Sequence, residues 1–190
     1  VFVWQTPTHK LNSPLPALKA GVPQPAVRAA AITANPVVVP ENITVHLGPP
    51  NSDAENVTVP FIYYIKNVAS SEIYPTWPEA ALRANILAQI TLALNRIYTE
   101  WYPSQGYDFD ITSSTAYDQN FINGRAVFDS ISAIVDEIFT NYVARAGSVA
   151  PVYTEYCDGF IAQCAGMSQW GTVELANQYY TPLDILRYYY

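Results

Sequence analysis

The only two cysteines of this chain, Cys157 and Cys164, have six residues between them. Two thiols at this spacing can form a disulfide, stay reduced or contribute to a metal site. An Asp-Gly pair follows Cys157 and favours a turn that would bring the sulfur atoms together. Zinc usually takes four ligands, and His9 and His46, the only histidines, lie far away in the sequence. A disulfide is the interpretation we favour, and we expect no metal and no cofactor.

Acidic residues offer a second kind of chemistry. Asp108 and Asp110 alternate along residues 107–112, a possible short strand or ordered loop, so both could lie on one side and form an acid pair. The alternative is the solvated edge of a loop. The sequence contains no G-x-x-x-x-G-K phosphate loop, no G-x-G-x-x-G and no H-E-x-x-H motif. The usual nucleotide-binding and zinc-protease motifs are therefore missing.

Two segments carry a family resemblance. Residues 69–84 read A-S-S-E-I-Y-P-T-W-P-E-A-A-L-R-A, and residues 166–171 read G-M-S-Q-W-G, followed at 185–190 by I-L-R-Y-Y-Y. The first is similar to the segment A-S-E-M-P-x-x-W-P-x-E-A-L-K-A of the stage II sporulation protein D (SpoIID) family, and the second resembles the C-terminal signature of that family. The family contains peptidoglycan lytic enzymes and amidase enhancers. The resemblance covers roughly residues 59–100 and 150–190.

By this resemblance, Glu72 stands where the family has its catalytic glutamate. Glycan cleavage needs a carboxylic acid to protonate the leaving oxygen and then a carboxylate base. In lytic transglycosylases one Glu can do both, because a hydroxyl of the sugar replaces water as the nucleophile. Ile73, Tyr74 and Trp77 can supply an apolar wall that raises the pKa of Glu72. The alternative is that Glu72 only ends a helix, in a fold that has lost the chemistry.

Three residues are candidates for substrate binding: Gln169, Trp77 and Ser168. Amides bind sugar hydroxyls or acetamido groups, and aromatic faces stack on pyranose rings. Ser168 is also a natural N-cap for a short helix. For Trp170, the neighbour of Gln169, we favour a role in the core.

The chain departs from the family pattern at two positions. The family often has Gly-His-Gly before G-M-S-Q, and here Gln163 takes the place of the His and Cys164 that of the following Gly. The Arg of a family segment A-A-R-T is Ile90 here. Both departures remove polar groups that could orient a substrate or tune Glu72, and they bear on activity more than on fold.

The elements that must position these residues are mostly helices. The spacing of apolar residues predicts helices over about residues 59–73, from the Thr76 cap to about Trp101, over about residues 125–145, and from about residues 168 and 181. The β-rich residues 37–48 and the segment 149–156 predict strands. The predicted fold class is α+β, a helix-dominated SpoIID-like domain with a few strands over residues 37–190.

Sequence signals also predict where two of these helices begin and how one is buried. Thr76 and Glu79 have the spacing of a capping box for the second helix. Thr181 and Pro182 predict the start of the last helix. Trp101 continues the apolar face of the second helix, so we expect it to point inward.

Residues 1–36 are predicted to form an extended, Pro-rich arm, because nine of the fifteen prolines lie in residues 1–50. Residues 1–40 carry a net charge of +3, and residues 41–190, with six basic and sixteen acidic residues, carry −10. This asymmetry favours docking of the arm on the body, within one molecule or between neighbours. The acidic body argues against nucleic acid as a partner. No stretch of about 18 apolar residues exists, so we expect no membrane span.

The sequence thus predicts an extracytoplasmic protein of the cell wall, cell surface or spore that cleaves or binds peptidoglycan glycan strands by lytic-transglycosylase-type chemistry. Only 13% of the residues are charged and fifteen are Tyr, which favours an alternative. That alternative is a non-catalytic structural subunit of a surface or spore-associated assembly, a homo-oligomer whose residues 1–36 dock on a neighbour. The amidase-enhancer branch implies a third, a non-catalytic partner of a wall hydrolase. The chain begins at Val1 rather than Met, so we also expect an upstream segment that this sequence does not include.

Overall fold

Helices form most of the regular structure, as the sequence predicts for this α+β chain. The computed structural model describes residues 2–4 and 37–190. Its helices are α1 (Phe61–Glu72), α2 (Glu79–Tyr98), a short 3₁₀ helix (Pro103–Gln105), α3 (Asp129–Ile138), α4 (Gln169–Asn177) and α5 (Pro182–Tyr189). Its strands are β1 (Phe2–Trp4), β2 (Asn42–His46), β3 (Asn56–Pro60), β4 (Ile111–Thr112), β5 (Tyr142–Ala144), β6 (Tyr156–Cys157) and β7 (Met167–Ser168). The remaining residues of the predicted arm lie outside the described residues.

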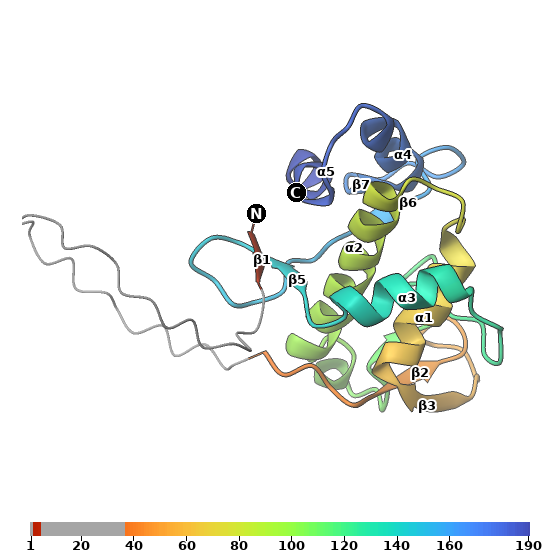
Figure 1. The fold of residues 1–190 in the computed structure, drawn as a ribbon. Coiled ribbons are helices and arrows are strands. Elements are labelled where there is room, and N and C mark those ends of the chain that lie inside the picture. Colours follow the sequence, from red (N-terminus) through yellow and green to blue (C-terminus); the bar gives the residue numbers. More distant parts are fainter. Residues whose placement is uncertain (1, 5–36) are drawn as a thin grey trace, which may run out of the picture.

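Helix α2 is the centre around which the other elements pack. Ile86, Ile90 and Leu94 recur every four residues and are buried, which is the spacing of one helical face. Helices α1, α3, α4 and α5 and strand β5 all contact α2. Figure 1 shows α4 and α5 near one end of α2, and α1 and α3 along its side. Burial of each such side chain contributes about 1.5–3 kcal/mol, so this helix anchors the core.

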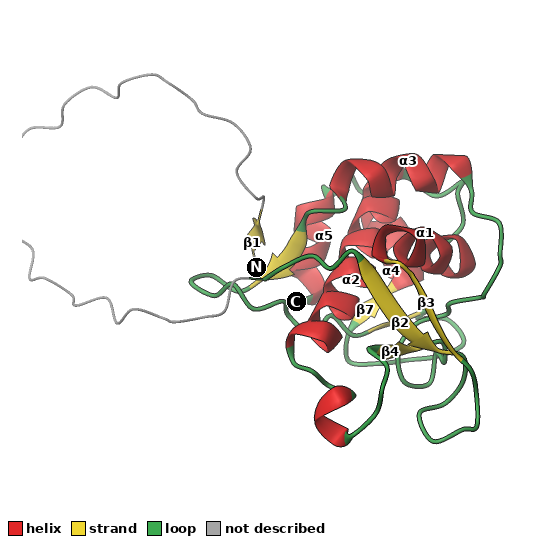
Figure 2. Cartoon of the chain, turned by 90° about the horizontal axis from the view of Figure 1, so that it is seen from below, coloured by secondary structure: helices red, strands yellow, loops and turns green. Residues whose placement is uncertain are grey.

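The strands form three small sheets. In the largest, β2 lies between β3, to which it is antiparallel, and β4, to which it is parallel. Strand β1 pairs antiparallel with β5, with Val3 opposite Val143. Strands β6 and β7 are parallel, so Tyr156 lies beside Met167. This last pair brings β6, which ends at Cys157, next to the start of α4. Figure 2 shows the strands in yellow and the helices in red.

Two of the predicted helix starts are confirmed. The Ser168 hydroxyl accepts the Gly171 N–H at 2.9 Å and caps α4. Thr181 and Asp184 form a capping box at α5. The box predicted at Thr76 is wrong: α2 begins after Pro78 without a side-chain cap. The Glu79 carboxylate instead accepts the Arg83 Nε–H at 2.7 Å, one turn further along α2.

Three other predictions about the helices need correction. Helix α3 is shorter than the predicted 125–145, because residues 142–144 form β5 against β1. Residues 56–60, partly assigned to the first helix, are strand β3, and 149–156 contributes only a bridge at Pro151 and the first residue of β6. Trp101 lies beyond the end of α2 and is 47% exposed, so it does not face the core. In the described residues, no helix has the length and apolar character needed to cross a membrane.

Candidate functional site

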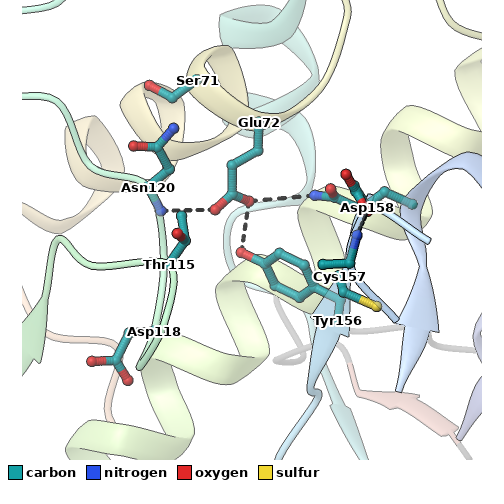
Figure 3. A pocket seen from close by; sticks show the side chains of 10 residues that line it. Ser71, Glu72, Thr115, Asp118, Asn120, Tyr156, Cys157 and Asp158 are labelled. Carbon is teal, nitrogen blue, oxygen red and sulfur yellow. Dashed lines mark hydrogen bonds between the residues drawn. The ribbon is translucent and has the colours of Figure 1, made fainter. Parts of the chain in front are cut away.

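Glu72, the last residue of α1, has its carboxylate held by donors from four other parts of the chain. Its Oε1 accepts the Asn120 backbone N–H at 2.8 Å. Its Oε2 accepts the Gln89 side-chain amide at 2.8 Å and the Tyr156 hydroxyl at 2.7 Å. The Gln169 amide makes a longer contact of 3.5 Å with the same oxygen. Figure 3 shows the carboxyl group between Asn120 and Tyr156.

The loop that supplies Asn120 is fixed against α1 by side-chain hydrogen bonds. Asn67 donates to the Ile122 carbonyl at 2.8 Å and accepts the Ile122 N–H at 2.9 Å. Ser70, one turn later, accepts the Phe128 N–H at 3.1 Å. Asn67 and Ser70 are both buried. These bonds fix the loop where its backbone can donate to Glu72.

A second layer of polar groups orients Tyr156. The Tyr64 hydroxyl donates to Gln119 Oε1 at 2.9 Å, and Gln119 Nε2 donates to the Tyr156 oxygen at 2.9 Å. Gln119 Nε2 also contacts the Gln89 carbonyl at 3.1 Å. Because its oxygen is engaged by Gln119, the Tyr156 hydroxyl proton is directed at Glu72. The chain of bonds is therefore ordered from the core to the carboxylate.

Burial and hydrogen bonding act on the Glu72 carboxyl in opposite directions. Although the residue as a whole is only partly buried, its carboxyl end is enclosed by protein atoms, and this desolvation raises its pKa. The bonds from Asn120, Tyr156, Gln89 and Gln169 lower it, and the net pKa is raised. Burial and the nearby Glu72 charge also raise the pKa of Tyr156 well above its usual range, so Tyr156 remains a donor.

Two cavities meet at Glu72. The larger has a volume of about 340 Å³. It is lined by Ser71, Glu72, Thr115, Asp118, Asn120, Tyr156, Cys157, Asp158, Ala162 and Gln169. The smaller, of about 190 Å³, is lined by Ser70, Ser71, Glu72, Ile73, Tyr74, Pro75, Arg125 and Phe128. Ser71 and Glu72 line both, so the two cavities adjoin at the end of α1.

An aromatic cluster lies beside the site. The ring centroids of Trp77 and Trp170 are 4.8 Å apart, and Tyr74 is 5.8 Å from each. Tyr74 and Trp170 are 58% and 44% exposed, whereas Trp77 is 9% exposed. The outer rings of this cluster are therefore Tyr74 and Trp170, with Trp77 beneath them. The core position that we expected for Trp170 is therefore wrong, because nearly half of its side chain is exposed.

The other predicted binding residues have different surroundings. Gln169 is buried, lines the larger cavity and contacts Glu72. Ser168 is engaged as the cap of α4 and packs against Gly159, where a Cβ would come within 1.8 Å of its oxygen. Gly159 has a φ of +79°, which favours glycine at this turn. Ser168 thus has a clear architectural role.

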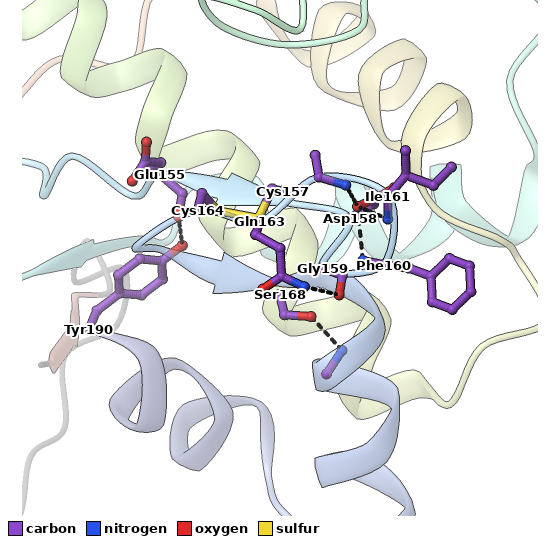
Figure 4. The surroundings of a disulfide bond; sticks show 12 residues. Glu155, Cys157, Asp158, Gly159, Phe160, Ile161, Gln163, Cys164, Ser168 and Tyr190 are labelled. Atoms are coloured by element: carbon purple, nitrogen blue, oxygen red, sulfur yellow. Dashed lines mark hydrogen bonds between the residues drawn. A yellow bond between two sulfur atoms is a disulfide. The ribbon is translucent and has the colours of Figure 1, made fainter.

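The predicted disulfide is confirmed. Cys157 and Cys164 are bonded with their Cα atoms 6.0 Å apart. Inside this loop, Asp158 Oδ1 accepts the backbone N–H groups of Phe160, Ile161 and Ala162 at 2.7–3.0 Å, as Figure 4 shows. These bonds lower the pKa of Asp158. Because Cys157, Asp158 and Ala162 line the larger cavity, the closed loop forms one of its walls.

The remaining acidic candidates are engaged elsewhere. Asp110 accepts the Thr44 N–H and Asp108 accepts the Asn56 amide, both at 2.8 Å beside the β2–β3 pair, and neither lines the Glu72 cavities. Asp118 does line the larger cavity, but its carboxylate pairs with buried Arg96 at 2.7 Å. In residues 2–4 and 37–190, no group of three or more His, Cys, Asp and Glu side chains is placed to hold a metal ion.

Sequence reasoning missed most partners of Glu72. Asn120 acts through its backbone, which leaves no signal in the sequence. Gln89 precedes Ile90, the position at which the family Arg was expected; Ile90 is a core residue, while Gln89 reaches the carboxylate. A polar residue in the middle of an apolar helix is a signal that could have identified Gln89, because buried amides need partners.

Comparisons with known proteins found no relative of this chain. A scan against protein-family models found no matching family, and searches of curated proteins and of solved structures found no match. The likeness to the SpoIID family therefore rests on the quoted residues, and the geometry around Glu72 is the basis for a functional proposal.

Proposed function

We propose that this chain is an extracytoplasmic, peptidoglycan-active protein that acts on glycan strands through Glu72. One observation carries the proposal: the Glu72 carboxyl, whose pKa is raised, is held by directed hydrogen bonds on a residue that lines two cavities. The exposed rings of Tyr74 and Trp170 beside it are of the kind that stacks on pyranose rings. The disulfide supports a setting outside the cytoplasm, because disulfides persist in oxidising compartments.

The proposed chemistry is that of a lytic transglycosylase. Protonated Glu72 donates its proton to the glycosidic oxygen as the bond to the anomeric carbon breaks. The resulting carboxylate then removes a proton from a hydroxyl of the same sugar, whose oxygen bonds to the anomeric carbon and closes an anhydro ring. Glu72 is protonated again at the end, so the atoms and protons balance without a metal or a second acid.

The neighbours of Glu72 suit both of its protonation states. Tyr156 and the Asn120 N–H donate to the carboxylate that forms after the first step. Gln89 can serve either state: its Nε2 donates to the carboxylate, and its buried Oε1 has no hydrogen-bond partner within the described part of the chain. Rotation of this amide would present Oε1 to the O–H of the protonated acid.

The first test is the Glu72→Gln variant of the full chain, incubated with purified glycan strands. Loss of a general acid typically lowers a rate by about 10²–10⁴-fold, so release of products that end in an anhydro sugar should fall by that factor. Glu174→Gln is a matched control, because Glu174 is an exposed glutamate on α4 outside both cavities. Release at the wild-type rate by the Glu72→Gln variant would show that the catalytic assignment is wrong.

A second candidate function is favoured by the β1–β5 pair. We propose it as the alternative: a non-catalytic subunit of a surface assembly, in which the N-terminal segment docks on a neighbouring copy. Residues 2–4 pair with β5 through an antiparallel ladder of three residue pairs. The same ladder could be made by the N-terminus of another copy, since a strand added at a sheet edge gains its affinity from main-chain bonds.

A further inference from the structure

The smaller cavity beside Glu72 contains the feature that goes furthest beyond the proposed function. Tyr74, 58% exposed, and Phe128, 42% exposed, are its two aromatic wall residues. Arg125, on the loop before α3, is the one basic residue that lines it. Ser71 and Glu72 separate this cavity from the larger one. A ligand bound at Glu72 would therefore have a cation within reach of one side.

Arg125 is held in place through its backbone. Its carbonyl accepts the Tyr63 hydroxyl at 3.4 Å, and its N–H donates to the Ile122 carbonyl at 3.1 Å. Its guanidinium lies over the Phe128 ring, 6.0 Å from the centroid. Backbone bonds and ring contact together limit the positions of the side chain and leave its five N–H donors available.

Within the described residues, no acidic side chain pairs with Arg125. Four other basic side chains there have acidic partners: Lys66, Arg83, Arg96 and Arg187. For Arg125, neither an ion pair nor a side-chain hydrogen bond is formed in residues 2–4 and 37–190. The exposed Arg145 also forms no ion pair in these residues, but it lines neither cavity beside Glu72. An unpaired guanidinium that lines a cavity is suited to an anionic group of a ligand.

We propose that the smaller cavity is a subsite for a carboxylate carried by the glycan, bound by Arg125. This inference rests on the proposed function and deepens it, because it names the sugar that lies beside Glu72. In peptidoglycan, alternate sugars carry a lactyl ether on O3. Its carboxyl is either free or linked to a peptide with carboxylates of its own. Glycans built from N-acetylglucosamine alone have no such group.

The chemistry of recognition follows from the geometry of a guanidinium. Arg offers parallel N–H donors that match the two oxygens of a carboxylate, and such charge-assisted bonds are about twice as strong as neutral ones. The Tyr74 and Phe128 rings provide apolar walls for the carbon atoms of the substituent. The subsite thus selects a muramyl sugar, and Arg125 acts as a specificity-determining residue rather than a catalytic one.

The experiment measures equilibrium binding of three ligands by the full chain carrying Glu72→Gln, which prevents cleavage. The ligands are glycan strands with free lactyl groups, strands that carry peptides, and N-acetylglucosamine oligomers of equal length. We expect at least one carboxylate-bearing ligand to bind about tenfold more tightly than the oligomers, and the preference to decline with salt. The tighter of the two carboxylate ligands identifies the source of the recognised group.

Adding Arg125→Gln should abolish this preference and leave binding of the N-acetylglucosamine oligomers unchanged. Arg125→Lys, which keeps the charge but not the paired donors, should retain part of it. Arg145→Gln is the matched control, because Arg145 is an exposed arginine outside both cavities. Two results would overturn this inference and leave the proposed function standing. One is equal binding of all three ligands by the Glu72→Gln chain that keeps Arg125, and the other is equal weakening of all three by Arg125→Gln. Failure to bind any glycan would overturn the proposed function with it.

Discussion

Uncharged donors surround the Glu72 carboxyl, and this determines how it titrates. The Asn120 N–H, the Gln89 amide and the Tyr156 hydroxyl stabilise the carboxylate without the strong pull of an adjacent cation. Burial therefore dominates, and the pKa of Glu72 is raised. Asp118, in the wall of the larger cavity, is instead paired with Arg96. A single group that must act first as acid and then as base needs the balance found at Glu72.

Tyr156→Phe tests that balance through the pH dependence of glycan cleavage. The Tyr156 hydroxyl lowers the pKa of Glu72, so its removal should raise that pKa further. In the proposed mechanism protonated Glu72 is the active acid, so the alkaline limb of kcat/KM should move to higher pH. The pH–rate profile of the variant checks this, with Tyr179→Phe as control, because Tyr179 is 95% exposed. An alkaline limb that stays in place or moves to lower pH would contradict the assigned role.

The same raised pKa has a consequence for stability. A carboxyl whose pKa is higher in the folded state than in the unfolded state stabilises the fold when protonated, that is, below its ordinary pKa. Its contribution is lost as the pH rises through the raised value. Glu72 therefore makes the fold less stable at higher pH, which is a cost that the donors from Asn120, Gln89 and Tyr156 reduce.

At the scale of elements, the sequence predicts what local chemistry determines. The caps at Ser168 and Thr181 and the apolar face of α2 were predictable, since each depends on residues a few positions apart. Strand β5 was not, because residues 142–144 continue the apolar pattern of α3 and become a strand only by pairing with distant β1. The site shows the same limit: Glu72 and Gln169 were predicted by resemblance, while the Asn120 contact depends on how a loop folds.

Loss of the Cys157–Cys164 disulfide should affect both the stability of the fold and the wall of the larger cavity. Closing a loop of this length restricts the unfolded chain by about 2–3 kcal/mol. Replacing both cysteines (Cys157→Ser with Cys164→Ser) should lower the free energy of unfolding by about that amount, measured by urea titration. Because Tyr156 precedes the bridge and Asp158 follows Cys157 in the cavity wall, glycan cleavage should decline too.

The control for this prediction is reduction of the disulfide. A reducing agent should lower the urea midpoint of the wild-type chain and leave that of the double serine variant unchanged. Equal midpoints for the oxidised wild type and the variant would show that the bridge does not stabilise the fold. Three backbone N–H bonds to Asp158 would then be the remaining support of the loop.

At the scale of the whole molecule, charge divides the chain into two unequal parts. Residues 1–40 carry +3 and residues 41–190 carry −10. The described part of the first segment, Phe2–Trp4, pairs with β5, which lies against the central helix α2. More than thirty residues separate this strand from β2 in the sequence, so a long connection links the two. A tether of this length allows the strand to reach β5 of its own body or of a neighbour.

Size-exclusion chromatography of residues 1–190 and of residues 37–190 distinguishes these arrangements. If the N-terminal segment docks on neighbours, the full chain should elute as an oligomer whose size increases with concentration, and the shorter chain as a monomer. Attraction between a +3 segment and a −10 body is screened by salt, so the association should weaken as the ionic strength rises. A full-length variant with Lys10, Lys19 and Arg28 changed to Gln separates the contribution of charge from that of the β1–β5 ladder. If both chains elute as the same monomer at every concentration, the assembly function fails, and action on glycan through Glu72 is the remaining proposal.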